Sequence, residues 1–127
     1  MSITTRIEPE HKLVIHTVSG DFGLVDVQPA WQAMLAHPDF RPDMNVMWDF
    51  RGITNLKDQF SSADIQQIAS MTVDHLQQRE KKYRLALVAE RDLLFGFSRM
   101  FAAYTGELPM DLRVFRSLEE ARAWLLE

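Results

Sequence analysis

The chain has 127 residues, the size of one ordinary domain, and 46% of them are hydrophobic while 25% are charged. This balance is typical of a packed core under a polar surface and excludes disordered, collagenous and low-complexity classes. A formal charge of −4 disfavours nucleic-acid binding, and the lack of cysteine excludes disulfides, thiol catalysis, iron–sulfur clusters and cysteine zinc sites.

The first third of the chain indicates a hairpin followed by a helix. Residues 3–8 and 12–18 are β-rich and flank a short polar turn with a proline, which predicts a β-hairpin. Residues 20–23 break this pattern, and apolar residues then recur at helical spacing over residues 24–36. Pro29 belongs near the first turn of that helix, where its missing N–H matters least.

The middle third indicates a strand, a long helix and another strand. Residues 44–50 are apolar on both faces, which suits the middle of a sheet covered by helices. Ser61 and Ser62 can cap a helix that runs to about residue 78, and residues 83–89 form a short apolar strand. A basic cluster at residues 79–84 is interpreted as a solvated helix end, with an anionic membrane or phosphate contact as the alternative.

The last third predicts two helices around one strand. Asp92 can cap a helix over residues 93–104, residues 112–115 form a strand, and Ser117 has capping-box spacing at the start of a final helix. At ~100° per residue, one arc of the helix over residues 93–104 is apolar and is predicted to face the core. Its members are Leu93, Leu94, Phe97, Met100, Phe101 and Tyr104.

The resulting order, ββαβαβαβα, predicts an α/β fold in which a five-stranded mixed sheet carries four helices. Strand–helix alternation with short connections implies parallel strands with right-handed crossovers, and the first hairpin strand is antiparallel. We expect one domain over residues 1–127. We also expect it to be cytoplasmic, because the N-terminal segment has no apolar signal core and no apolar run approaches the ~20 residues that span a membrane.

Catalytic and metal-binding patterns are not found. None of the four histidines has metal-ligand spacing, and the sequence has neither a glycine-rich phosphate loop nor a serine in a nucleophile elbow. We therefore expect no metal, no cofactor and no enzyme. The one enzymatic alternative is a pocket built from Asp49, Arg51 and Asp58, for which the sequence suggests no reaction.

Two pairs of residues stand out as candidates for binding. Asp49 and Arg51 share a face at the carboxyl end of a central strand, where open α/β sheets present their sites, although an ion pair that closes the strand is an equal alternative. Phe95 and Arg99 lie one turn apart on the outer side of the helix over residues 93–104. An aromatic residue beside an arginine is typical of partner surfaces, but scattered exposed apolar residues are also ordinary.

The strand order and several motifs resemble the STAS domain (sulfate transporter and anti-sigma antagonist), in particular its small SpoIIAA-like branch, which is related in fold to CRAL-TRIO lipid-binding domains. The matching segments are WDFRG (residues 48–52), FGFSRMF (95–101), VFR (114–116) and EEARAWL (119–125). They occur in the expected order over nearly the whole chain. The resemblance implies a STAS-like fold and a role in regulation or protein interaction.

The phosphorylation switch of anti-sigma antagonists is not matched. In that family the corresponding strand leads to an aspartate–serine pair, and a partner kinase phosphorylates the serine. Counting from Asp49, the pair falls on Lys57 and Asp58, so the serine is absent there. Ser61 and Ser62 are nearby candidates, but helix capping explains them.

The parallel strands bring three loops to one edge, and each loop contains a phenylalanine. The loops are residues 21–23, 54–62 and 91–95, with Phe22, Phe60 and Phe95. This aromatic rim is either a docking patch or the mouth of an apolar pocket. The first case is our leading hypothesis, a non-enzymatic interaction module that forms a homodimer; the second predicts a protein that binds a small apolar or lipid-like ligand.

Overall fold

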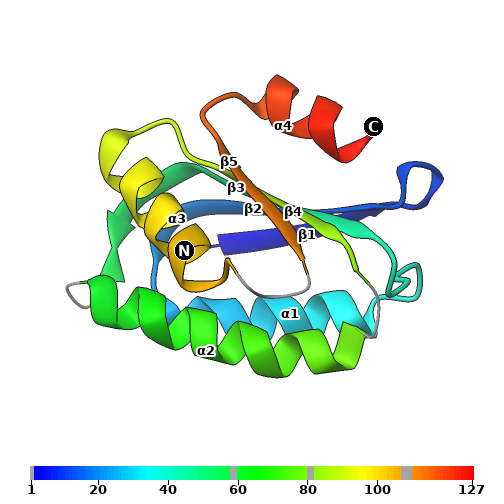
Figure 1. The fold of residues 1–127 in the computed structure, drawn as a ribbon, viewed down its shortest axis with the longest axis horizontal. Coiled ribbons are helices and arrows are strands. Elements are labelled where there is room, and N and C mark those ends of the chain that lie inside the picture. Colours follow the sequence, from blue (N-terminus) through cyan, green and yellow to red (C-terminus); the bar gives the residue numbers. More distant parts are fainter. Residues whose placement is uncertain (1, 58–59, 80–81, 107–109) are drawn as a thin grey trace.

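A computed structural model describes residues 2–57, 60–79, 82–106 and 110–127 of the chain (Figure 1). The strands are β1 (Ser2–Glu8), β2 (Leu13–Phe22), β3 (Asn45–Leu56), β4 (Arg84–Val88) and β5 (Asp111–Phe115). The helices are α1 (Val27–Ala36), α2 (Ser62–Arg79), α3 (Asp92–Tyr104) and α4 (Leu118–Leu125), with short 3-10 turns η1 (Pro9–His11) and η2 (Leu24–Asp26).

The five strands form one sheet in the order β1-β2-β3-β4-β5, so that neighbours in sequence are also neighbours in space. β1 is antiparallel to β2, and the other pairs are parallel. The predicted α/β fold, with a five-stranded mixed sheet and four helices in the described part of the chain, is confirmed. No described helix is long and apolar enough to cross a membrane.

The helices are divided unequally between the two faces of the sheet. α1, α2 and α3 pack on one face and α4 packs on the other (Figure 1). Each of the first three helices connects two parallel strands that are adjacent in the sheet, and crossovers of one hand place all of them on the same side. α4 follows the last strand and is free to cover the opposite face.

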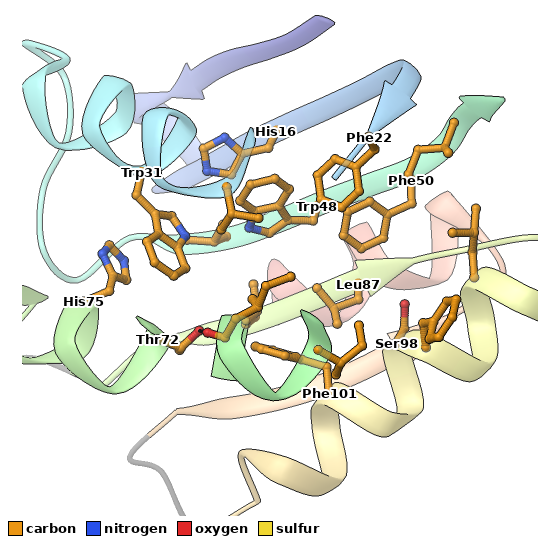
Figure 2. A pocket seen from close by; sticks show the side chains of 18 of the residues that line it. His16, Phe22, Trp31, Trp48, Phe50, Thr72, His75, Leu87, Ser98 and Phe101 are labelled. Carbon is orange, nitrogen blue, oxygen red and sulfur yellow. Dashed lines mark hydrogen bonds between the residues drawn. The ribbon is translucent and has the colours of Figure 1, made fainter. Parts of the chain in front are cut away.

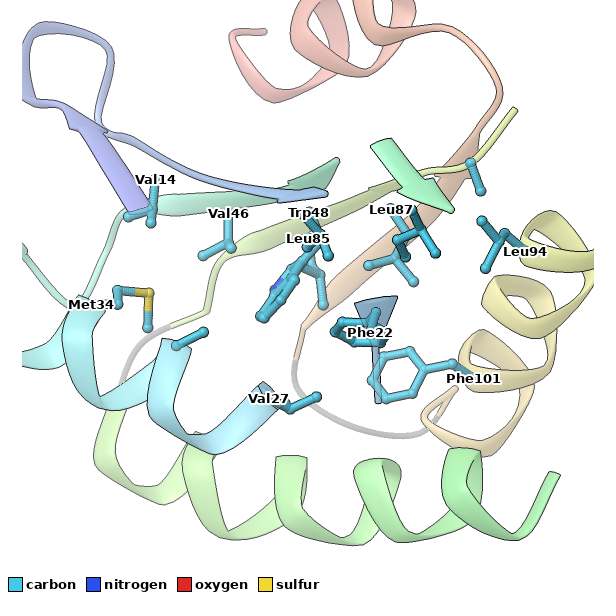
Figure 3. Close-up of a cluster of buried hydrophobic side chains, with 14 of the residues drawn as sticks. Val14, Phe22, Val27, Met34, Val46, Trp48, Leu85, Leu87, Leu94 and Phe101 are labelled. Atoms are coloured by element: carbon cyan, nitrogen blue, oxygen red, sulfur yellow. The ribbon is translucent and has the colours of Figure 1, made fainter. Parts of the chain in front are cut away.

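Two hydrophobic clusters follow from the alternation along the strands. Val14, Val46 and Leu85 face the three crossover helices and belong to the larger cluster (Figure 3). Leu13 and Met47, their neighbours in sequence, face α4 in the smaller cluster. The central strands are therefore buried on both faces, as their apolar sequence predicted.

The strands of the hairpin and the sheet centre are longer than predicted. β2 continues through the predicted break to Phe22, and β3 continues to Leu56 rather than ending at Phe50. The two strands pair over these extensions, with Asp21 opposite Asn55 and Phe22 opposite Leu56. Gly20 allows this continuation because it adopts a φ of 75°, which favours glycine.

The buried face of α3 is rotated from the predicted arc. Leu93 is 63% exposed and Tyr104 45%, whereas Leu94, Ser98 and Phe101 are buried. The prediction of a core stripe that includes Leu93 and Tyr104 is wrong at these two positions because the helix buries a serine among its apolar residues.

Helix caps agree with the sequence in part. The Ser117 side chain accepts a hydrogen bond from the Glu120 N–H, as predicted for α4. At α2 the Asp64 carboxylate accepts a bond from the backbone N–H of Ser61 at 2.8 Å. α3 begins at Asp92, so this residue is not the cap that was predicted.

An ion pair joins the first strand to the last helix. The Arg122 guanidinium of α4 donates to both Glu8 carboxylate oxygens, at 2.6 and 3.4 Å. Glu8 also contacts His11 at 2.9 Å. Hydrogen bonds from Arg122 and His11 together lower the pKa of Glu8 from 4.5 to about 2.

We predict that Glu8→Gln lowers the free energy of unfolding by about 0.5–1 kcal/mol at neutral pH, because the pair is only partly exposed. A carboxyl whose pKa is lower in the folded state stabilises the fold above its unfolded pKa. The difference in free energy of unfolding between Glu8→Gln and the original protein should therefore shrink as the pH falls from about 4.5 and vanish near 2. Urea denaturation at several pH values measures this.

Asp43→Asn is the matched control, since Asp43 pairs with Lys12 at 3.4 Å on a far more exposed surface. It should change the free energy of unfolding by less than about 0.5 kcal/mol. An equal effect of both variants, or a Glu8→Gln effect that does not depend on pH, would contradict the role assigned to the Glu8–Arg122 pair.

Candidate functional site: an apolar cavity between the sheet and three helices

A partly open cavity lies between the sheet and helices α1, α2 and α3 (Figure 2). Its volume is about 90 Å³, which is room for several waters, since one water needs about 10–15 Å³. This is smaller than the ~300–1,000 Å³ pockets of drug-sized ligands, so the cavity suits a small molecule.

Strand β3 supplies the floor of the cavity through two irregularities in its pairing with β2. Val46 and Trp48 face the cavity, followed by Phe50, Ile53 and Leu56. Alternation alone would turn Ile53 away from Phe50, but β3 contains an extra residue between its paired positions 49 and 52, and another between 53 and 55. Each extra residue restores the apolar side chains to the cavity face.

A continuous series of aromatic contacts runs along the cavity wall. Trp48 contacts Phe50 with ring centroids 5.9 Å apart, and Phe50 contacts Phe22 at 5.6 Å. Phe22 lies 6.2 Å from Phe60, and Phe60 meets Phe97 of α3 edge-on at 5.3 Å. These separations are those of favourable aromatic pairs. The wall therefore joins residues from two strands, a loop and a helix.

Helices α1 and α2 meet over the cavity through stacked rings. Trp31 and His75 lie 4.6 Å apart with an interplanar angle of only 12°, and both line the cavity (Figure 2). On the sheet side, the His16 ring packs at 4.3 Å from Trp48. The Nδ1 atom of His16 hydrogen-bonds the Thr5 hydroxyl, which lies directly opposite on β1.

The lining is otherwise apolar, with few polar side chains. The groups that can hydrogen-bond or ionise are the side chains of His16, Thr72, His75, Tyr83 and Ser98 and the indole N–H groups of Trp31 and Trp48. Among the described residues that line the cavity, none is an aspartate, glutamate, lysine or arginine. The arrangement can hold a small apolar molecule.

A buried ion pair braces the loop that follows β2. The Asp26 carboxylate accepts bonds from the Gly23 N–H at 2.8 Å and from the Lys57 ammonium at 3.2 Å. Asp26 is buried, so both bonds compensate for its loss of water. Lys57, on which the count from Asp49 placed the aspartate of the anti-sigma antagonist pair, ties the end of β3 to η2.

The predicted aromatic rim is only partly assembled. Phe22 and Phe60 come together in the cavity wall, but Phe22 is buried and Phe60 half-buried. Phe95 is not among the lining residues; its half-buried ring packs under the Arg116 guanidinium, 4.1 Å from the ring centroid. The three rings therefore do not form one exposed patch, and two of them line a cavity.

Asp49 and Arg51 form the ion pair that was one of the two alternatives. The Arg51 guanidinium donates to both Asp49 oxygens, at 2.9 and 3.0 Å. The hydrogen bond to Asp49 raises the pKa of Arg51. Neither residue lines the cavity.

The remaining predicted site residues are dispersed. Arg99 is exposed on α3, Ser61 precedes α2 and Ser62 is its first residue, both exposed. Asp58 lies outside the described residues. Their roles in binding or phosphorylation stay predictions.

Possible metal ligands come together at one place in the described part of the chain. Glu8, Glu10 and His11 lie close enough to share an ion, but Arg122 already occupies both oxygens of Glu8. In the basic cluster, the Arg84 guanidinium donates to the Trp124 carbonyl at 2.6 Å, so this residue anchors α4.

Sequence reasoning missed the polar part of the cavity. His75 and Ser98 were not singled out, although each occupies a helix position in register with buried apolar neighbours. His16 was interpreted as a hydrogen-bonded sheet residue, which its bond to Thr5 confirms. A polar residue within an apolar helical stripe is the sequence signal that was available for both His75 and Ser98.

The fold is similar to that of a solved structure. An uncharacterised protein of the DUF3478 family from Shewanella loihica PV-4, described as having a SpoIIAA-like fold, aligns with a TM-score of 0.60 and 15% identity. The alignment covers 98% of this chain and 92% of that one. The chain thus has a SpoIIAA-like fold, as the resemblance implied; the relation to CRAL-TRIO domains stays a prediction. The sequence matches no family model and no curated protein.

The irregular pairing of β3 depends on Gly52. A methyl group at this position would lie 2.7 Å from the Val18 carbonyl oxygen, which is backbone and cannot move aside easily. We predict that Gly52→Ala lowers the free energy of unfolding by about 1–3 kcal/mol. Gly96→Ala is the matched control: nothing lies within 4 Å of the added methyl, and Gly96 is inside α3.

Gly96→Ala should raise the free energy of unfolding by about 0.5–1 kcal/mol, because alanine is the better helix former. Urea denaturation measures the free energy of unfolding of both variants, and the two changes should have opposite signs. A neutral Gly52→Ala would contradict the close approach of β3 to β2.

Proposed function

We propose that this protein binds a small, largely apolar molecule in the cavity between the sheet and helices α1–α3. The observation that carries the proposal is an aromatic and aliphatic lining around unfilled, partly open space. Protein cores are close-packed, so a space of this size is unusual unless something fills it. Binding rather than catalysis is proposed, since the lining carries no charged side chain in the described residues.

The positions of the predicted rim residues support this proposal over a docking patch. A docking patch needs exposed rings, whereas Phe22 is buried and Phe60 contacts Phe97 inside the lining. A pocket mouth needs rings that face inward, which is where Phe22 and Phe60 lie. The second of the two sequence-based hypotheses therefore becomes the leading one.

We expect the purified protein to bind the neutral fluorophore N-phenyl-1-naphthylamine with an increase in its fluorescence, because the lining shields it from water. Ile68→Trp, which enlarges a half-buried lining residue of α2, should weaken binding at least about tenfold by filling the space. Native mass spectrometry after gentle purification should in addition show a small molecule that co-purifies.

Val73→Trp is the matched control, because Val73 is on the same helix but 42% exposed and outside the lining. It should bind the fluorophore like the original protein. Circular dichroism and thermal melting verify that both variants fold. Absence of fluorophore binding to the original protein, together with a clean apo mass, would refute the proposal.

Protein interaction is a second candidate function, supported by the SpoIIAA-like fold. Two large apolar side chains are exposed just after the carboxyl ends of parallel strands: Val25 at 66% and Leu93 at 63%. Val25 follows β2 and Leu93 follows β4. Exposed apolar side chains at such an edge suit a protein contact, and for a homodimer the same edge would meet its copy.

For this candidate we expect sedimentation equilibrium to show a dimer that Leu93→Asp converts to monomer, because a buried unpaired carboxylate opposes association. Leu126→Asp is the control, since Leu126 is 41% exposed but follows α4 on the other face of the sheet. A monomeric original protein, or equal effects of both variants, would count against self-association through this edge.

A further inference from the structure

Ser98 is a buried hydroxyl in the apolar part of the cavity. It is only 5% exposed and lies on α3 between the lining residues Leu94 and Phe101. Figure 2 shows its side chain directed from α3 towards the sheet, on which Phe50 and Leu87 lie. A serine at such a position buries a polar group where an alanine would pack as well and favour the helix more.

Two other buried hydroxyls, one on α2 and one at the end of α3, have partners in those helices. Thr72 donates to the Ile68 carbonyl at 2.8 Å, and Thr105 donates to the Phe101 carbonyl at 2.9 Å. Both bonds are to the residue four positions earlier, the usual solution for a buried hydroxyl in a helix. Within the described part of the chain, Ser98 makes no hydrogen bond. Its hydroxyl is therefore available to a molecule in the cavity.

Several other polar groups of the lining interact with protein residues around them. The His16 ring bonds Thr5, and His75 stacks on Trp31. Tyr83 also has an interaction with its surroundings. Of the two helix hydroxyls in the described lining, Thr72 and Ser98, Ser98 is thus the one without a hydrogen bond among the described residues.

The lining also disfavours a charged ligand. An ion that enters an apolar cavity loses its hydration, which is costly unless an opposite charge compensates it. The described lining residues include no lysine, arginine, aspartate or glutamate. The Lys57 ammonium, which lies nearby in the chain, is held by Asp26 at 3.2 Å.

From these observations we infer that the ligand is neutral and has an apolar body with one hydroxyl or carbonyl oxygen, and that Ser98 is the residue that recognises this oxygen. The inference rests on the proposed binding function and specifies its ligand class. A hydroxyl can donate to a carbonyl or accept from an alcohol, so both ligand types satisfy it. The described lining offers an ionised carboxylate or ammonium no lysine, arginine, aspartate or glutamate as a partner, which disfavours both.

Four probes of one shape test the inference by isothermal titration calorimetry at neutral pH: naphthalene, 2-naphthol, 2-naphthoate and 2-naphthylmethylammonium. One net hydrogen bond should make 2-naphthol bind about threefold to tenfold tighter than naphthalene. The two charged probes should bind at least about 100-fold more weakly than 2-naphthol.

Ser98→Ala should abolish the preference for 2-naphthol and leave the affinity for naphthalene unchanged. Thr72→Val is the control, because the Thr72 hydroxyl is committed to the Ile68 carbonyl; it should retain the preference. Thermal melting verifies that both variants fold.

The outcomes separate the two proposals. If none of the probes binds, the cavity is not a ligand site, and both the proposed function and this inference fail. If naphthalene binds but 2-naphthoate binds as well as 2-naphthol, or if Ser98→Ala keeps the preference for 2-naphthol, cavity binding stands and the inference about Ser98 and ligand charge is wrong.

Discussion

The handedness of the strand crossovers is the constraint on which the rest of this structure depends. β2, β3, β4 and β5 follow one another across the sheet, so three crossovers of the same hand place three helices on one face. These helices must cover a surface that carries Trp48, Phe50 and Phe22. The cavity lies between these rings and the helices. The opposite face, covered by α4 alone, has a smaller cluster.

Most of the architecture could be predicted from local sequence patterns. The apolar runs at β3 and β4 indicated buried parallel strands, and the Ser117 cap located the start of α4. The carboxyl ends of β2 and β3 could not be predicted, because they are held together by backbone pairing between residues more than thirty positions apart. Local periodicity contains no information about such pairing, and Gly20 resembled a strand break.

Some residues of the candidate site were predicted from the sequence, but their arrangement was not. Phe22 and Phe60 were identified, but whether they form a patch or a pocket depends on the extra residues in β3, which rotate Ile53 and Leu56 towards the helices. Phe95 was placed at the rim, yet Arg116, from the segment after β5, covers its ring. The burial of Ser98 was not predicted, because the helical arc was calculated from hydrophobic residues and left the serine out. Tertiary packing decides each of these points.

The Glu8–Arg122 pair joins residues 114 positions apart, and this separation has a kinetic consequence. Closing so long a loop is entropically unfavourable, so the contact forms only after most of the sheet has assembled. Interactions that are absent from the folding transition state slow the rate of unfolding while leaving the folding rate nearly unchanged. We therefore expect the salt bridge between the first strand and the last helix to slow unfolding more than it speeds folding.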